Sequence, residues 1–350
     1  MVKVQQAEYI WLDGRVPTKR LRSKTRIIKD LGDSPKMSDF PEWSYDGSST
    51  YQADGGNSDL ILVPVNFITD PIRGEGNFLV MCEVMNEDGT PHKSNERAKL
   101  RSTLEKGAAA VEPWFGFEQE YVLFEGSRPV GWPENGYPPP QGPFYCGVGP
   151  NQVYGRVMVE EHTKLCMDAG IMIYGVNAEV MPAQWEFQIG YRGIDGESAD
   201  ALNTSDHVWF ARWLLFRVGE NYGIEATLAN KPVQGDWNGS GQHTNFSTSP
   251  MRSPETGRET ISRYIDLFAN KHQEHIDVYG ANLAQRLTGD HETCSISEFR
   301  AGDADRGASI RIPRQVADKG YGYIEDRRPG ANADPYQITN RILMTICELD

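Results

Sequence analysis

Two glutamates lie two residues apart inside a segment that otherwise has the pattern of a buried β-strand. The segment is WFGFEQEY, and it places Glu118 and Glu120 on one face because side chains alternate along a strand. Aromatic and aliphatic residues occupy the other face, which must therefore pack against a core. Two carboxylates held this close repel each other unless solvent or a cation compensates, and a divalent metal ion is the usual answer. The pattern predicts a strand with one face in the core and the other in a polar site.

Three other segments repeat this alternation. The segment QWEFQIG places Glu186 between two glutamines on one face, with apolar side chains on the other. Residues 321–328 and 309–312 also alternate between two faces. Glu179 comes seven residues before Glu186, and Pro182 between them favours a bend that lets both glutamates face the same space. We therefore expect a sheet whose polar face is an active site.

The composition limits the classes of function. The chain has 350 residues, enough for two domains and a sizeable core, and 39% of the residues are hydrophobic. A net charge of -14 argues against a general nucleic-acid-binding protein. We find no apolar run of membrane-spanning length and no signal peptide. Five scattered cysteines without a CxxC pair indicate reduced thiols. We expect a cytoplasmic protein that binds neither nucleic acid nor membrane.

Local patterns predict the elements that carry these segments. Further strands are expected at residues 7–12, 22–29, 60–65 and 78–84, and helices at 93–111, 154–169, 200–222 and 255–279. Asn95 or Ser94 would cap the first helix. Residues 131–151 are dense in proline and glycine and are expected to form an ordered, packed loop. We place a domain boundary between residues 92 and 93.

Seven motifs, in this order along the chain, resemble those of the glutamine synthetase family. They are YDGSS, WFGFEQEY, NAEVMPAQWEFQIG, GDWNGSGQHTNFST, RLTGDHET, SIRIPR and EDRRPGANADPY. The match covers about residues 8–348 and is similar to the shorter type II class. The resemblance implies an α+β fold. A small N-terminal β-grasp domain would occupy residues 1–92, and a large catalytic domain with a curved antiparallel sheet and flanking helices would occupy residues 93–350.

The resemblance also implies the reaction. Members of the family make glutamine from L-glutamate, ammonium and ATP by phosphorylating the γ-carboxylate and then letting ammonia displace phosphate from the γ-glutamyl phosphate. Such chemistry needs cations beside the nucleotide, arginines on the moving phosphoryl group and an anionic pocket for ammonium. The resemblance implies two or more Mg²⁺ or Mn²⁺ ions per site. It also implies a homo-oligomer, a decamer of two stacked pentameric rings with sites between subunits.

The resemblance extends to individual site residues. Six match the metal ligands of the family, three for each of two ions: Glu120, Glu179 and Glu186, and Glu118, His243 and Glu325. The positions that match glutamate and phosphoryl contacts are Asn238, Gly239, Arg286, Arg306 and Arg327. The positions that match nucleotide contacts are Trp114, Glu118, Glu186, Asn245, Ser247, Arg306 and Arg311.

Arg306 and Arg327 match the pair of arginines that stabilises the charge of the phosphoryl group. Two more residues, Asp46 and Glu292, match positions that act directly in the reaction. Asp46 of YDGSS matches the residue that binds ammonium and takes its proton, and the resemblance implies that it serves the site of a neighbouring subunit. On local sequence alone Asp46 would be a turn residue. Glu292 matches the glutamate of a flap that closes over the acyl phosphate and helps to deprotonate the tetrahedral adduct, and closure of this flap excludes water.

Three alternatives remain at this stage. A related ligase would join a different amine, such as a polyamine, to glutamate, and the presence of Asp46 argues against it. A structural relative would keep the rings and lose the ligands, whereas all six matching ligands are present. A metal-dependent phosphatase or kinase would not need all seven motifs. An assay of phosphate release with and without ammonium separates this last class from the ligases.

Overall fold

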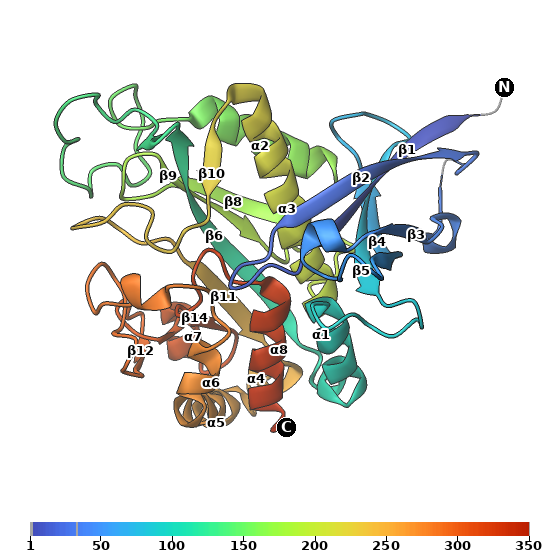
Figure 1. The fold of residues 1–350 in the computed structure, drawn as a ribbon. Coiled ribbons are helices and arrows are strands. Elements are labelled where there is room, and N and C mark those ends of the chain that lie inside the picture. Colours follow the sequence, from blue (N-terminus) through green and yellow to red (C-terminus); the bar gives the residue numbers. More distant parts are fainter. Residues whose placement is uncertain (1–2, 33, 350) are drawn as a thin grey trace.

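The computed structural model describes residues 3–32 and 34–349, and a smaller β-rich part lies beside a larger mixed part (Figure 1). The smaller part contains β1 (Val4–Leu12), β2 (Leu21–Lys29), β3 (Trp43–Asp46), β4 (Asp59–Thr69) and β5 (Phe78–Met85). Among the described residues these strands form one sheet in the order β2-β1-β5-β4-β3. β1 and β5 run parallel, and the other neighbours are antiparallel. Buried aromatic residues such as Tyr9, Trp11 and Phe40 form the core of this part.

A second sheet forms the centre of the larger part (Figure 1). Its strands are β6 (Trp114–Glu125), β7 (Arg128–Pro129), β8 (Ile173–Ala178), β9 (Gln184–Ile189), β10 (Glu225–Thr227), β11 (Gln242–Ser247), β12 (Ala301–Asp303), β13 (Ile310–Ile312) and β14 (Ile324–Asp326). In the described chain their order is β12-β13-β14-β11-β6-β9-β8, and β7 and β10 also pair with β6. The expected antiparallel arrangement holds except between β12 and β13, which are parallel.

Helices surround this sheet. The α-helices are α1 (Glu96–Glu105), α2 (Arg156–Asp168), α3 (Ala201–Tyr222), α4 (Ser249–Arg252), α5 (Gly257–Asn270), α6 (His272–Ile276), α7 (Arg314–Lys319) and α8 (Pro335–Ile346). Short 3-10 turns are η1 (Met37–Asp39), η2 (Ser48–Thr50), η3 (Ala108–Val111) and η4 (Leu283–Gln285). α3 packs on the apolar face of β6, where Phe117 and Tyr121 are fully buried. Gln119 shares that face and accepts two hydrogen bonds from the buried Arg212 of α3.

Several predicted elements are confirmed and several are wrong. α2 and α3 lie within two residues of the predicted bounds, and Asn95 caps α1 by accepting a hydrogen bond from the N–H of Ala98 at 3.0 Å. The first helix is shorter than expected because Gly107 adopts a φ of 123°. The expected long helix at 255–279 is divided at Lys271 into α5 and α6. The strand expected at 321–328 is reduced to β14, and the sequence patterns do not predict β3, β7, β10, β11 and β12.

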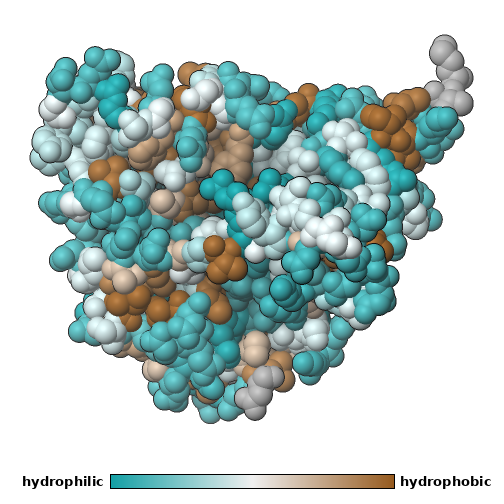
Figure 2. Space-filling model, in the orientation of Figure 1, coloured by the Kyte–Doolittle hydropathy of each residue, from teal (hydrophilic) through white to brown (hydrophobic). Residues whose placement is uncertain are grey.

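The visible surface is mostly hydrophilic, with separate hydrophobic patches (Figure 2). Within residues 3–32 and 34–349, no helix combines the length and the apolar character that crossing a membrane requires. All five cysteines lie in the described chain and none is joined to another in a disulfide.

Candidate active site

The pairing of β6 with its two neighbours places polar side chains opposite one another. His243 of β11 pairs with Glu118, and Glu186 of β9 pairs with Glu120. β14 pairs with β11 on the side away from β6, and Glu325 of β14 lies on the same face of the sheet. Residues two apart in a strand share a face, so both glutamates of β6 point to this side of the sheet, opposite α3. The expected division of β6 into an apolar and a polar face is confirmed.

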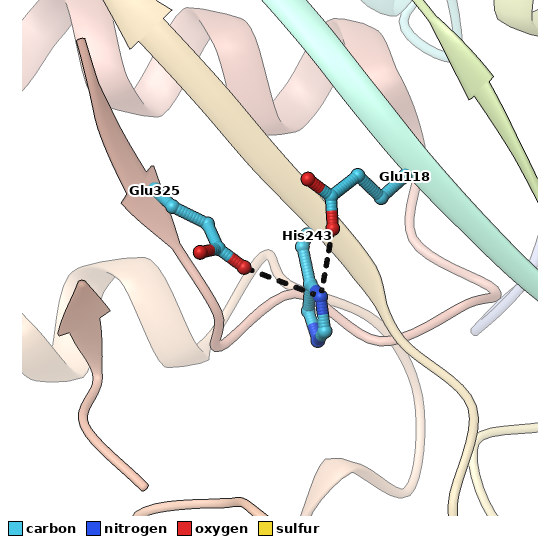
Figure 3. Close-up of side chains that lie close together, drawn as sticks. All are labelled: Glu118, His243 and Glu325. Atoms are coloured by element: carbon cyan, nitrogen blue, oxygen red, sulfur yellow. Dashed lines mark hydrogen bonds and ion pairs between the residues drawn. The ribbon is translucent and has the colours of Figure 1, made fainter. Parts of the chain in front are cut away.

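Two overlapping groups of ligand atoms form on this face. Glu118, His243 and Glu325 make one group, and Glu120, Glu186 and His243 make the other. Within each group the ligand atoms lie within 4.8 Å of one another. Figure 3 shows His243 between Glu118 and Glu325, and its Nδ1 atom lies 3.4 Å from a carboxylate oxygen of each. Carboxylate oxygens with one imidazole form a donor set that suits Mg²⁺ or Mn²⁺.

The carboxylates of the second group are buried beside one another. Burial, together with the nearby Glu118 and other carboxylates, raises the pKa of Glu186 to about 9. Burial and the charge of Glu120 raise the pKa of Glu179 to about 8. Burial also raises the pKa of Glu120. Glu186 and the neighbouring Glu179 therefore hold protons at neutral pH when nothing else compensates their charge, and a divalent cation would take the place of these protons.

The bent hairpin expected around Pro182 is present. β8 ends at Ala178 and β9 begins at Gln184, and Ala183 between them has a φ of 64°. Glu179 follows β8 directly and accepts a hydrogen bond from Asn177 at 2.9 Å. Its carboxylate is not a member of either close group of ligand atoms, although its charge is coupled to that of Glu120.

His243 is held as a neutral imidazole. Burial and the nearby positive charge of Arg327 place its pKa well below the usual range. The Nη2 atom of Arg286 lies 2.9 Å from the Nε2 atom of His243, and an arginine can only donate there. The proton of the neutral ring is therefore on Nδ1, which faces the carboxylates. Neutral imidazole is the form that binds metal, and an ion at Nδ1 would displace that proton.

Arg286 fits against the backbone of the WNGSGQH loop because two of its residues are glycines. A Cβ atom on Gly241 would lie 2.4 Å from the Nη2 atom of Arg286, and one on Gly239 would lie 2.7 Å from its Cγ atom. Any other residue at either position would displace the guanidinium from His243. The N–H of Asn238 in this loop donates to the Oε1 atom of Gln141 at 2.7 Å.

Arginines converge on Glu325 from both sides. Arg327 donates from Nη1 to one carboxylate oxygen at 2.5 Å, and Arg311 donates from Nη1 to the other at 2.8 Å. The Nε atom of Arg327 donates to the backbone oxygen of Arg306 at 2.9 Å, while the side chain of Arg306 is exposed. Three of the arginines expected to contact phosphate are thus next to the carboxylates expected to bind metal.

The aromatic end of β6 lies on the same face, about 13 Å along the strand from Glu118. Trp114 pairs with Ser247 of β11. Arg252 covers the Trp114 ring at 4.0 Å from its centroid and donates to the hydroxyl of Ser247 at 3.0 Å. Asn245 lies between the two ends and donates to the carboxylate of Glu118 at 2.9 Å. A planar apolar surface is therefore connected to the charged group by one continuous face.

The catalytic-domain model of glutamine synthetase matches residues 93–348, and its β-grasp-domain model matches residues 3–87. The chain belongs to the glutamine synthetase family. A glutamine synthetase of Streptomyces viridochromogenes is 51% identical over 342 residues, covering 98% of this chain and 96% of the relative. The chloroplastic glutamine synthetase of Chlamydomonas reinhardtii is 51% identical over 351 residues, covering 97% and 90%. Glutamine synthetase 2 cytoplasmic of Drosophila melanogaster is 49% identical over 350 residues, covering 98% and 91%.

Membership in this family establishes the fold class and the reaction expected from the motifs. The smaller sheet belongs to a β-grasp domain, and the larger part is the catalytic domain. The protein is a glutamate–ammonia ligase that joins ammonia to the γ-carboxylate of L-glutamate through a γ-glutamyl phosphate, giving glutamine, ADP and phosphate. Glutamine synthetases use ATP and divalent metal ions, and their substrates are small molecules.

Other side chains at the site were not expected from the sequence. Tyr191 contacts Trp114 with ring centroids 5.3 Å apart, and Arg252 covers the same indole. Tyr174 is 46% exposed, but its hydroxyl end lies near the carboxylates, and the partial burial of that end together with the charge of Glu118 raises the pKa of the hydroxyl. Alternation along β8 could not have placed Tyr174, because the ladder shifts register between Ile173 and Gly175.

Two of the expected catalytic residues, Asp46 and Glu292, lie away from the polar face of the catalytic sheet. Glu292 is exposed in the loop after RLTGD, and it is close enough to Glu179 to help raise the pKa of that residue. Asp46 ends β3 at the edge of the N-terminal sheet, and β3 lies well apart from β6, β9 and β11 of the same chain (Figure 1). Hydrogen bonds from Ser48 and Ser49 lower the pKa of Asp46 to about 2.

Proposed function

We propose that the polar face of β6, β9, β11 and β14 holds two divalent ions beside the transferred phosphoryl group. The observation that carries this proposal is the pair of ligand groups that share His243. One ion would be held by Glu118, His243 and Glu325. The other would be held by Glu120 and Glu186, with Glu179 completing its ligands. Mg²⁺ or Mn²⁺ would neutralise phosphate charge there, which is what phosphoryl transfer requires.

We infer that four arginines bind the phosphate and carboxylate groups of the substrates. Arg306 and Arg327 would stabilise the phosphoryl group as it moves from ATP to the γ-carboxylate, and Arg311 would contact the nucleotide phosphates. Arg286, which is buried, would orient glutamate together with Asn238 and Gly239. A guanidinium suits these roles because it binds two oxygens at once and stays charged.

The nucleoside would occupy the aromatic end of the face. Trp114 offers a surface on which adenine can stack, and Ser247 and Asn245 offer polar contacts. Glu118 and Glu186 would reach the phosphates through the metal ions. The separation of about 13 Å between Trp114 and Glu118 along β6 leaves room for an extended nucleotide.

The second half of the reaction would need Asp46 and Glu292. Ammonia attacks the acyl carbon, the new C–N bond forms, and the bond from that carbon to the phosphate oxygen breaks. The ammonium nitrogen loses two protons on the way to the amide: Asp46 would take the first, which gives ammonia, and Glu292 would help to take the second from the tetrahedral adduct. Asp46 is ionised at neutral pH, which suits the attraction of ammonium. Glu292 would close over the acyl phosphate and exclude water.

Because Asp46 lies far from the carboxylates of its own chain, we propose that it serves a neighbouring subunit. A closed ring supplies such a neighbour to every chain, and the assembly we propose is a decamer of two stacked pentamers. We also propose a domain boundary between residues 92 and 93, in the segment that follows β5, and a cytoplasmic location. The name of the Drosophila relative supports that location, whereas the Chlamydomonas relative is chloroplastic.

Manganese binding tests the two-ion proposal. Electron paramagnetic resonance of free Mn²⁺ should give two ions bound per chain in the wild-type protein. Glu325→Gln should lose one ion, and Glu186→Gln should lose the other, with Mn²⁺ at the remaining site bound normally. Glu112→Gln, at an exposed position, is the matched control. One ion in the wild-type protein, or unchanged binding in both variants, would contradict the assignment.

A further inference from the structure

The side chain of Gln141 connects two loops that are far apart in the sequence. Gln141 lies in the proline- and glycine-rich loop of residues 131–151. Its Oε1 atom accepts a hydrogen bond from the backbone N–H of Asn238 at 2.7 Å. Its Nε2 atom lies 3.1 Å from the Nδ1 atom of His291. On the other side of that imidazole, Nε2 lies 3.1 Å from a carboxylate oxygen of Asp236.

The directions of these hydrogen bonds follow from one fixed donor. A backbone N–H can only donate, so the atom of Gln141 that faces Asn238 must be the oxygen. The NH₂ group of Gln141 then donates to Nδ1 of His291, which must carry no proton there. The ring proton is on Nε2, where it donates to Asp236. The chain of bonds therefore holds His291 in a single orientation.

His291 directly precedes Glu292, so the imidazole anchors the segment that carries this glutamate. Both residues have left-handed backbone conformations, with φ of 52° and 59°, which non-glycine residues adopt only when surrounding contacts compensate. Thr293 donates from its hydroxyl to the backbone oxygen of Asp290 at 2.7 Å. Arg327 donates to the backbone oxygen of Glu292 at 3.4 Å. The strained pair thus lies between contacts on both sides, and both Gln141 and Asp236 join His291 to the loop around Asn238.

We propose that Gln141 is a positioning residue that couples the glutamate-binding loop at Asn238 to the loop that carries Glu292. The inference rests on the proposed roles of Asn238 and Glu292. Glutamate bound beside Asn238 would then hold Glu292 over the acyl phosphate. When the coupling is broken, water attacks the acyl carbon in place of ammonia, the bond to phosphate oxygen breaks, and glutamate is regenerated with ATP consumed.

The test compares phosphate released with glutamine formed by the full-length Gln141→Ala enzyme. We expect the ratio of phosphate to glutamine to exceed that of the wild-type enzyme, and the KM for glutamate to rise about five- to tenfold, the scale of one lost hydrogen bond. Gln234→Ala, at an exposed position in the same loop as Asn238, should change neither quantity. A Gln141→Ala enzyme with the wild-type ratio and KM overturns the proposal. A lower kcat with both unchanged also overturns it, because that result indicates only a structural role.

One further variant keeps the test decisive if Gln141→Ala does not fold. Asp236→Ala removes the other contact between His291 and the loop that contains Asn238, so it should raise the ratio instead, and an unchanged ratio refutes the coupling.

Glu292→Ala separates a failure of this inference from a failure of the proposed function. If Glu292→Ala leaves the ratio and kcat at wild-type values, the proposed role of Glu292 is wrong and the coupling through Gln141 is wrong with it. If Glu292→Ala raises the ratio and Gln141→Ala does not, only the coupling is wrong.

Discussion

At the scale of single residues, the buried carboxylates of the polar face repel one another when no metal ion is bound. Glu120 and Glu186 are 7% and 5% exposed and lie opposite each other on paired strands. Burial and neighbouring carboxylates raise the pKa of Glu186 to about 9, against an ordinary value of 4.5. Between these values the folded protein binds a proton that the unfolded chain releases. The contribution of Glu186 to stability therefore falls as the pH rises through this window.

This linkage predicts how Glu186→Gln behaves. In the absence of metal, the Tm of the wild-type protein should fall more steeply between pH 5 and pH 9 than that of Glu186→Gln, because the amide never ionises. Saturating Mg²⁺ or Mn²⁺ should raise the Tm of the wild-type protein most at the upper end of this range, where the ion replaces protons. Thermal unfolding in chelator and in metal measures both effects. Parallel pH profiles for the two proteins would show that Glu186 ionises normally.

A second residue-scale prediction concerns Gly241. The Cβ atom of Gly241→Ala would meet the guanidinium of Arg286 at 2.4 Å and the Nε2 atom of His243 at 3.0 Å. Displacement of these groups by about 1 Å should lower kcat/KM by about 100-fold. Gly56→Ala is the control, because a Cβ atom there meets open space. Steady-state kinetics give kcat/KM for both variants. A fully active Gly241→Ala enzyme would mean that activity does not depend on the observed position of Arg286.

At the scale of elements, a buried ion pair joins the N-terminal sheet to the helices of the catalytic domain. Arg97 of α1 binds Asp206 of α3 through two hydrogen bonds of 2.8 and 2.9 Å and binds Glu83 of β5 at 3.0 Å. Tyr336 of α8 donates to Asp206 at 2.6 Å, and Asn66 of β4 donates to it at 2.9 Å. Three helices and one strand therefore meet at the carboxylate of Asp206, and Arg97 links β5 to it.

Asp206→Asn should destabilise the protein strongly. The change replaces one of the two carboxylate partners of the buried Arg97 with a neutral amide and leaves only Glu83, and breaking a buried pair in this way lowers the free energy of unfolding by about 3–5 kcal/mol. Asp168→Asn, at an exposed position, should lower it by less than about 1 kcal/mol. Urea denaturation followed by circular dichroism compares the two. Equal midpoints would show that solvent reaches Asp206 and that the junction contributes little.

At the scale of the whole molecule, the position of Asp46 separates two parts of the proposed active site. Asp46 ends the edge strand of the N-terminal sheet, whereas the carboxylates lie on the central face of the other sheet (Figure 1). If each complete site combines these parts from two chains, different defects in different chains can compensate each other. Such compensation requires only that the chains mix within one closed assembly.

Assemblies formed from two different inactive variants therefore test whether two chains share each site. Asp46→Asn and Glu186→Gln should each have low activity alone, and assemblies formed from equal amounts of both should recover roughly a quarter of the wild-type activity per chain. The recovery arises where a chain with intact Glu186 meets a neighbour with intact Asp46. A mixture of Glu120→Gln with Glu186→Gln is the control, because both changes affect the same half of the site. Glutamine formation measures the outcome, and no recovery in the first mixture would place Asp46 and Glu186 in one chain's site.

The face on which each glutamate of β6 lies could be predicted from the sequence because alternation along a strand depends only on adjacent residues. Two helices and the cap at Asn95 were predictable for the same reason. The division of the last long helix at Lys271 was not, since nothing in its local pattern marks the break. The family motifs identified the residues of the proposed site, but they did not indicate their distances or partners.

What the sequence by itself determined is therefore local or shared with relatives: strand faces, helix caps, the family and its reaction. Only the tertiary structure placed His243 opposite Glu118, because that contact depends on the register between β6 and β11, which are more than a hundred residues apart. It also brought Arg252 onto Trp114 and joined Gln141 to both Asn238 and His291. Contacts between distant segments depend on how the whole chain packs, and no local pattern of side chains specifies them.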